Sequence, residues 1–228
     1  MVPVVHIKTW TDKLIYRFFE APKGLDFACN YYPYEKGSDH MWYERTTKKH
    51  LSMLFSRFAD KSLPVLDIGC GKGFVLYWLN KLGFSRVDGI ECDQAMVAVA
   101  NRNLAVAGLA DQSKVFHVDA RAFSGYDDYQ VIYMFHPFKE RIMRDVVKRL
   151  EESLTRAPRQ FVVVYFYPVE HRVFDESDLF LLREKHVMYF INTVMDAYYY
   201  EFDPAHTARR GGRFRDLLER EMQEGNAK

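Results

Sequence analysis

Val65-Leu-Asp-Ile-Gly-Cys-Gly-Lys-Gly73 is the stretch that decides how this chain folds. An apolar run ends in three glycines at alternate positions, Gly69, Gly71 and Gly73, and an apolar helical pattern follows. Glycine lacks a Cβ atom, so this turn can adopt positive φ and let a ligand approach the backbone closely. In an open α/β sheet, such a turn lies at the carboxyl edge, where ligands bind. The stretch therefore predicts a strand, a ligand-binding turn and a helix, although a tight strand–helix connection would carry similar glycines.

Short β-branched runs alternate with longer helical patterns from residue 63 onward, which is typical of parallel strands joined by crossover helices. The sequence predicts strands at 63–68, 86–91, 115–118, 131–135 and 161–167. It predicts helices at 73–82, 93–108, 138–156 and 175–184. Residues 186–202 are expected to form one or two strands that turn back near 192–197, with an antiparallel last strand. The predicted fold class is a doubly wound, Rossmann-like α/β fold with a mostly parallel sheet.

We expect one core, residues 61–204, with a flanking segment at each end. Residues 1–60 are predicted to be an N-terminal extension that covers the substrate or the cofactor, and residues 205–228 a charged C-terminal tail. The formal net charge of +1 gives no overall attraction to nucleic acid or to an anionic membrane. Nucleic-acid binding through a local patch, such as Arg209-Arg-Gly-Gly-Arg213, stays open.

The cysteines argue against a metal centre. Cys29, Cys70 and Cys92 are odd in number and lack the spacing of zinc sites, so neither a metal nor a disulfide framework is predicted. The longest apolar stretch, 161–169, is too short to cross a bilayer. Residues 1–10 do not resemble a signal peptide. The sequence therefore predicts a cytoplasmic protein without membrane association.

Acidic residues stand at the ends of three successive predicted strands. Asp67 precedes the glycines, Glu91 ends the second strand, and Asp119 ends the third. Glu91 can accept hydrogen bonds from both hydroxyls of a ribose, and Asp119 can meet the amino group of an adenine. The Asp67 carboxylate would repel a pyrophosphate but would attract a cation. Each acid alone would also fit a helix cap or a solvated strand end, whereas the three together favour an adenosyl ligand without phosphates.

These segments resemble the motifs of class I S-adenosylmethionine-dependent methyltransferases. The first motif is similar to Leu66–Gly73, the second to Gly89-Ile-Glu-Cys-Asp93, and the third to Asp119-Ala120. The resemblance implies that S-adenosylmethionine is the cofactor and that the three glycines wrap its methionine and ribose portion. It implies that Glu91 holds the ribose and Asp119 the adenine. The expected cofactor residues in these motifs are Asp67, Gly69, Cys70, Gly71, Gly73, Glu91, Cys92, Asp119 and Ala120.

The end of the fourth predicted strand, Val131–Phe138, resembles the Asn-Pro-Phe motif of a bacterial methyltransferase group of uncertain substrate. Here His136 replaces the asparagine. A histidine can take a proton or a hydrogen bond from the acceptor, so His136 is the candidate catalytic residue. A packed turn residue beside Pro137 is the alternative. Pro137, Phe138 and Tyr167 are candidate substrate residues, Tyr167 because its segment resembles the Asn-Pro-Val-His ending of the same group.

Tyr43-Glu-Arg-Thr46 resembles a Tyr-x-Pro-Thr element that closes over the cofactor in those relatives. Arg45 stands in place of the proline. Tyr43 and Thr46 are therefore added to the expected cofactor residues. The alternative for Thr46 is a simple helix N-cap.

The predicted activity is methyl transfer from S-adenosylmethionine to an unidentified acceptor, which can be a small molecule, a protein or an RNA group. The Asn-Pro-Phe-like loop favours a nitrogen acceptor, and O-methylation stays open. One alternative is a nicotinamide-dependent oxidoreductase, since glycines followed by a distal acid fit that class too. Another is a non-catalytic regulator that binds S-adenosylmethionine, for which His136 in place of asparagine is the hint.

Overall fold

The apolar run before the glycines forms strand β1 (Val65–Ile68) in the computed structural model, and all of its residues are buried. Helix α3 (Phe74–Lys81) follows the glycines, and strand β2 (Val87–Glu91) comes next, again buried along its whole length. Helix α4 (Gln94–Val106) and the short strand β3 (Val115–His117) continue the alternation. Parallel strands covered on both faces are buried throughout, and here even the acidic residues Asp67, Asp88 and Glu91 of β1 and β2 are buried.

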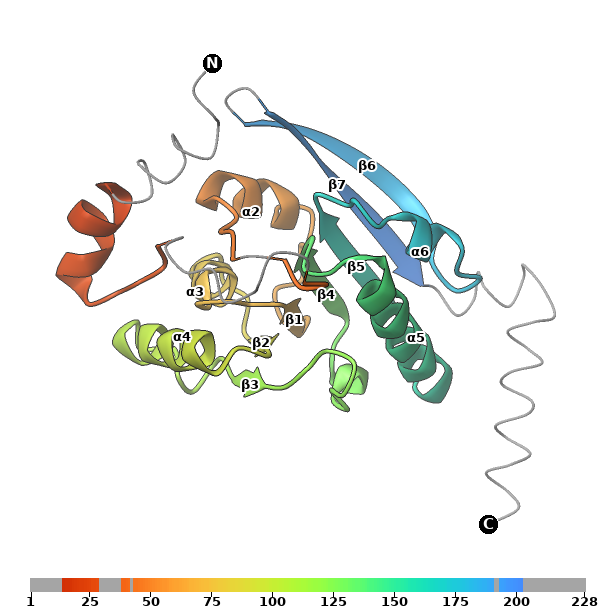
Figure 1. Ribbon diagram of the computed structural model, residues 1–228, viewed down its shortest axis with the longest axis horizontal. Coiled ribbons are helices and arrows are strands. Elements are labelled where there is room, and N and C mark those ends of the chain that lie inside the picture. Colours follow the sequence, from red (N-terminus) through yellow and green to blue (C-terminus); the bar gives the residue numbers. More distant parts are fainter. Residues whose placement is uncertain (1–13, 29–37, 42, 191–192, 203–228) are drawn as a thin grey trace, which may run out of the picture. The chain divides into compact units, whose positions relative to one another are not determined.

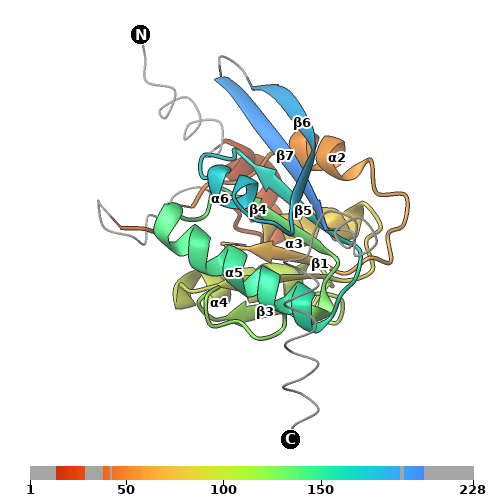
Figure 2. The ribbon, with the colours of Figure 1, turned by 90° about the vertical axis from the view of Figure 1, so that its right-hand side faces the viewer.

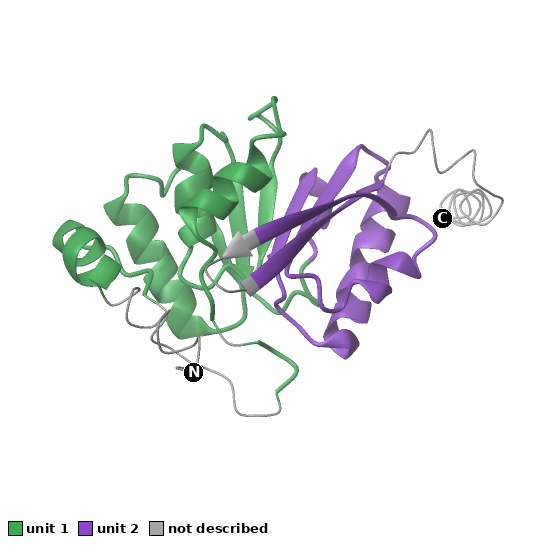
Figure 3. Cartoon of the chain, turned by 90° about the horizontal axis from the view of Figure 1, so that it is seen from above, with its two compact units in different colours: residues 1–123 green, residues 124–228 purple. Residues whose placement is uncertain are grey.

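The structure describes residues 14–28, 38–41, 43–190 and 193–202. The chain forms two compact units, residues 1–123 and residues 124–228 (Figure 3). In the first unit the strands are parallel and follow the order β3-β2-β1 (Figure 1). The predicted charged tail, 205–228, lies outside the described residues. The division into extension, core and tail stays a prediction.

The N-terminal residues form short helices where the structure describes them. A π-helical turn, η1 (Tyr16–Glu20), leads into a 3-10 turn, η2 (Ala21–Lys23), which ends at Gly24 in the left-handed conformation. Helix α2 (Lys48–Phe55) precedes β1. Thr47 caps α2, because its side-chain oxygen accepts a hydrogen bond from the amide of its third residue, at 3.2 Å.

In the second unit, two parallel strands are followed by two antiparallel ones. β4 (Val131–Phe135) pairs in parallel with β5 (Phe161–Phe166), and helix α5 (Glu140–Arg156) connects them. β7 (Thr193–Phe202) is antiparallel to β5 and to β6 (Leu181–Phe190), so the order is β4-β5-β7-β6. Figure 2 shows β6 and β7 as a long two-stranded ribbon. The remaining elements are η3 (Tyr126–Asp128) and α6 (Arg172–Asp175).

The antiparallel last strand is confirmed, but the helix predicted at 175–184 is wrong. Residues 181–190 form β6 instead. The apolar residues Leu179-Phe-Leu-Leu182 are consecutive, so they give no helical period. After them exposed side chains alternate with more buried ones, with Arg183 and Lys185 exposed, and this is the period of a strand.

Among the described residues, no helix is both long and apolar enough to span a membrane. The longest described helix, α5, has 17 residues and charged side chains along its whole length. Within the same part of the chain, no group of three or more histidine, cysteine, aspartate or glutamate side chains is arranged to hold a metal ion.

Candidate functional site

The turn after β1 depends on backbone conformations that glycine adopts easily. Gly69, Gly71 and Gly73 have positive φ values of 77°, 52° and 79°. The amides of Gly69 and Cys70 both donate to the Ile90 carbonyl, at 2.9 and 3.0 Å, which ties the turn to the end of β2. The three glycines singled out in the sequence thus shape one turn at the carboxyl end of β1.

The ring of Tyr43 lies against this turn at Gly71. A Cβ atom at Gly71 would overlap with ring atoms Cδ2 and Cε2 of Tyr43, so this contact requires glycine in addition to the φ of 52°. The Tyr43 hydroxyl donates to the Phe27 carbonyl at 3.2 Å. The structure therefore brings Tyr43 to the glycine turn, while its contact with the cofactor stays a prediction.

Glu91 joins the end of β2 to the same turn. The residue is 6% exposed, and its Oε2 accepts a hydrogen bond from the Gly71 amide at 3.0 Å. Its Oε1 accepts from the amides of Cys92 and Asp93, at 2.9 and 3.0 Å. A carboxylate has about four acceptor positions, and backbone amides fill three of them here. The backbone therefore orients Glu91 before any ligand is bound.

Asp67 and Cys70 are buried close to Glu91. Asp67 is 3% exposed, and this burial raises the pKa of its carboxyl well above the usual value, with a further increase from the charge of Glu91. Burial also raises the pKa of the Cys70 thiol, and the charges of Asp67 and Glu91 add to this effect. A cation bound nearby would lower both pKa values, because it favours the ionised forms. The turn therefore suits a positively charged ligand better than a phosphate.

Asp119, just after β3, is held by a residue that the sequence analysis did not single out. The Arg121 guanidinium donates to both carboxylate oxygens, from Nε to Oδ1 at 3.0 Å and from Nη2 to Oδ2 at 2.7 Å. The Arg121 amide donates to Oδ1 at 2.8 Å. These hydrogen bonds hold the pKa of the Asp119 carboxyl below its usual value. An adenine amino group would have to share Asp119 with Arg121.

His40 is a second residue that the sequence analysis missed. Its Nδ1 lies 3.8 Å from the Sγ of Cys92, and its charge contributes to lowering the pKa of Asp119. The ring of His117 contacts the Cys92 carbonyl oxygen at 3.0 Å. Ala120 is 5% exposed. The residues expected around the adenine are therefore accompanied by two imidazole rings.

The N-cap alternative for Thr46 is wrong, because Thr47 caps α2. Thr46 is 3% exposed. Its role toward the cofactor stays a prediction.

The second unit carries the acceptor candidates, and two of them have an unusual backbone. His136 follows β4 with a φ of 35°, and Tyr167 follows β5 with a φ of 51°. The strands pair Phe135 with Phe166, so both residues stand at the same strand edge. Their rings are perpendicular, with centroids 5.7 Å apart. Non-glycine residues in this region cost of order 1–3 kcal/mol each and cluster at functional sites.

The imidazole of His136 has one nitrogen without a hydrogen-bond partner among the described residues, Nδ1, which is buried. Burial lowers the pKa of His136, so the neutral ring predominates at neutral pH. Pro137 is buried and Phe138 is 5% exposed, whereas Tyr167 is 40% exposed. Of the three substrate candidates, Tyr167 therefore offers the largest surface to an acceptor.

Residues 65–157 match a family model described as a methyltransferase domain. This part of the chain is therefore similar to a methyltransferase domain. The chain is 33% identical over 109 residues to the ribosomal protein L11 methyltransferase of Caldanaerobacter subterraneus subsp. tengcongensis, covering 47% of this chain and 35% of that protein. It is 31% identical over 70 residues to the same enzyme of Acetivibrio thermocellus, covering 31% of this chain and 22% of the relative. The chain thus matches about a third or less of these relatives' length.

Solved methyltransferases share the fold of this domain. An RNA methyltransferase from Salinibacter ruber, in complex with S-adenosyl-L-homocysteine, aligns with a TM-score of 0.55 at 16% identity, over 71% of this chain and 95% of that one. The ribosomal protein L11 methylase of Lactobacillus delbrueckii subsp. bulgaricus aligns with a TM-score of 0.53 at 19% identity, over 68% of this chain and 79% of that one. The predicted Rossmann-like fold class is therefore confirmed.

Some functional candidates in the structure are not marked by any sequence motif. Arg121 and His40 acquire their significance from contacts with Asp119 and Cys92 that only the fold creates. Lys72 did carry a signal, because it stands between two glycines in a turn that is otherwise small and apolar. Its side chain is 4% exposed, which is rare for a lysine.

Proposed function

We propose that this chain transfers a methyl group from S-adenosylmethionine to an acceptor, with the cofactor bound on the glycine turn of residues 69–73. One observation carries the proposal. The buried Glu91 carboxylate accepts a hydrogen bond from the Gly71 amide, next to a buried Asp67 whose pKa is raised. Two buried acidic side chains beside a glycine turn fit a sulfonium ligand with an ammonium group. They would repel the diphosphate of a nicotinamide cofactor.

Each acid has a separate part in cofactor binding. When bound, S-adenosylmethionine supplies a methyl group on a positively charged sulfur. Glu91, already oriented by three amides, accepts hydrogen bonds from the ribose hydroxyls. Asp119 shares its oxygens between Arg121 and the adenine amino group. Asp67 becomes ionised as the cation arrives, which strengthens the attraction.

His136 receives a hydrogen bond or a proton from the acceptor. Its buried Nδ1 lacks a partner among the described residues, and burial lowers the pKa of the ring, so the neutral form is available near pH 7. The half-exposed ring of Tyr167 lies at right angles to it and offers a surface for the acceptor. Positioning supplies much of the rate in an in-line displacement, so both residues act mainly by orienting the acceptor.

The acceptor is a nitrogen atom of a protein, an RNA or a small molecule in this proposal. Relatives named after ribosomal protein L11 and RNA support the two macromolecular classes, and the Asn-Pro-Phe-like loop supports nitrogen. The net charge of +1 does not favour RNA over protein. The cytoplasmic location stays a prediction.

Calorimetry on the full chain tests the cofactor. S-adenosylhomocysteine and S-adenosylmethionine should bind, and NADH should not. Binding of NADH alone would overturn the proposal in favour of an oxidoreductase. Incubation of a cell extract with methyl-labelled S-adenosylmethionine then tests turnover, and treatment with protease or ribonuclease identifies the labelled class. Cofactor binding without any label transfer would favour the non-catalytic regulator.

A further inference from the structure

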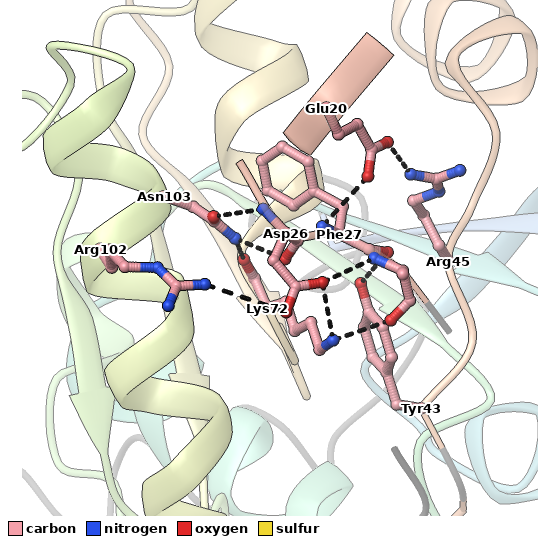
Figure 4. Close-up of polar contacts among 9 residues, drawn as sticks. Glu20, Asp26, Phe27, Tyr43, Arg45, Lys72, Arg102 and Asn103 are labelled. Carbon is pink, nitrogen blue, oxygen red and sulfur yellow. Dashed lines mark hydrogen bonds and ion pairs between the residues drawn. The ribbon is translucent and has the colours of Figure 1, made fainter. Parts of the chain in front are cut away.

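Lys72, inside the glycine turn, is held by the N-terminal segment. Its Nζ donates to Asp26 Oδ1 at 3.0 Å and to the Ala28 carbonyl at 2.8 Å (Figure 4). The lysine side chain is 4% exposed and the Asp26 side chain 21%. A buried ammonium is costly unless it is paired and hydrogen-bonded. The position of segment 26–28 is therefore coupled to the charge of a residue in the cofactor turn.

Asn103 of α4 joins the same two segments through their backbones. It is 0% exposed. Its Oδ1 accepts from the Asp26 amide at 2.9 Å, and its Nδ2 donates to the carbonyls of Asp26 and Lys72, at 2.8 and 2.9 Å. Because the bonds run to backbone groups on both sides, Asn103 fixes the register of the segment against the turn.

The contacts continue from this segment to the ring that covers the turn. The Phe27 carbonyl accepts the Tyr43 hydroxyl at 3.2 Å, and the Phe27 amide donates to Glu20 Oε2 at 3.2 Å (Figure 4). The other oxygen of Glu20 pairs with Arg45, close to Tyr43 along the chain. Tyr43 then lies against Gly71, the residue before Lys72. A closed path of contacts therefore runs from Lys72 through the segment and back to the turn.

We propose that Lys72, Asp26 and Asn103 are positioning residues for the cofactor, which act by fixing Tyr43 over the glycine turn. This inference rests on the proposed function. A buried ion pair is weak evidence for stability, since apolar residues of similar volume often replace one without loss. The ion pair matters here for position rather than stability. The Lys72 ammonium and the side-chain amide of Asn103 together fix where segment 26–28 lies. None of these three residues is among those that the class I motifs assign to the cofactor.

The first test measures the affinity of the full chain for S-adenosylhomocysteine by calorimetry. Lys72→Met removes the ammonium and should weaken binding about tenfold. Tyr43→Phe breaks the other end of the path by removing one hydroxyl, and should weaken binding a few-fold with little risk to folding. Arg102→Ala is the matched control: Arg102 also contacts Asp26, at 3.9 Å, but its side chain is 57% exposed. The control should bind like the wild type.

A double-variant cycle separates positioning from general stability. If Lys72 acts through Tyr43, then Lys72→Met should cause no further loss of affinity in a Tyr43→Ala background. Additive losses would overturn the inference, as would unchanged affinity in both Lys72→Met and Tyr43→Phe.

Trypsin cleavage after the exposed Lys23 gives a readout that does not need the cofactor. Lys72→Met should be cut there about tenfold faster than the wild type, because segment 26–28 is released. If the wild type fails to bind S-adenosylhomocysteine, the proposed function fails; if it binds but cleavage and affinity are the same in Lys72→Met, only the positioning role fails.

Discussion

The two candidate regions bend the chain after parallel strands by different means. After β1, the left-handed positions fall on glycines, and the nearby Glu91 carboxylate is satisfied by three backbone amides. After β4 and β5, they fall on His136 and Tyr167, and a buried imidazole nitrogen lacks a partner among the described residues. The backbone of the first region is therefore unstrained and already shaped for a ligand. The second region carries backbone strain and an imidazole nitrogen that is available to a ligand. We therefore expect cofactor binding to depend on features common to glycine turns, and binding of the methyl acceptor to depend on the particular side chains of His136 and Tyr167.

Gly71→Ala should have the largest effect. The new Cβ would overlap with the Tyr43 ring and would adopt an unfavourable φ, so affinity for S-adenosylhomocysteine should fall at least about 100-fold. Gly83→Ala is the matched control, because Gly83 also has a positive φ, of 93°, but its Cβ would meet no atom within 4 Å. Gly83→Ala should lower the melting temperature without changing affinity. Equal affinities of the two variants would contradict the role of the Tyr43 contact.

Glu91→Ala should weaken binding of S-adenosylhomocysteine by about 1–3 kcal/mol, because the ribose loses charge-assisted hydrogen bonds and the Gly71 amide loses its acceptor. Glu91→Gln, which keeps one acceptor oxygen, should lose less. Calorimetry measures both. Wild-type affinity in a folded Glu91→Ala protein would remove Glu91 from the cofactor site.

His136→Ala should lower methyl transfer about tenfold or more while leaving S-adenosylhomocysteine affinity within twofold. The reason is that the imidazole is assigned to the acceptor and not to the cofactor. His186→Ala serves as the control, because that ring is 42% exposed and pairs with Glu184 on β6. A full rate in His136→Ala would leave His136 as a packed turn residue.

The pH dependence sharpens the same assignment. Burial lowers the pKa of His136, and only the neutral ring can take a proton, so the rate should rise with pH with a midpoint below about 6.5. His136→Asn should lose this acidic limb, and Asn tolerates a positive φ. The pH–rate profiles of both proteins check this, and a midpoint above 6.5 in the wild type would speak against it.

Asp67→Asn should have the smallest effect of these variants, a modest gain in the stability of the unliganded protein. Because folding raises the pKa of Asp67, the folded state binds more protons than the unfolded state, and stability falls as the pH rises from the usual pKa through the raised one. Removing the charge should therefore raise the melting temperature of the unliganded protein by about 2–4 °C at pH 8. The same variant should bind S-adenosylmethionine less tightly. A lower melting temperature at pH 8 would contradict the raised pKa.

The first region was more predictable from sequence than the second. Gly69, Gly71 and Gly73 stand in one local pattern, and β1 and β2 are short segments rich in β-branched residues before and after it, so local rules sufficed for the strands and the turn. Lys72 and Asp26 are 46 residues apart, and no local rule predicts that they meet.

The positive φ values of His136 and Tyr167 were also not predicted, because only a few per cent of non-glycine residues adopt them, even though histidine does so more often than most. The helix predicted at 175–184 failed for a related reason. Pairing with β7 decides that the segment beginning at Leu181 is a strand, and this pairing is a tertiary contact.

The protonation of the Cys70 thiol affects how easily the protein can be alkylated by its own methyl donor. A methyl donor is an alkylating agent, and a thiolate is the nucleophile in a protein that such an agent modifies most readily. Burial and two neighbouring acids keep the pKa of the Cys70 thiol high before the cofactor binds, so almost no thiolate forms in the unliganded turn. The acids that attract a sulfonium thereby also keep the sulfur beside it in its unreactive form until the methyl donor is in place.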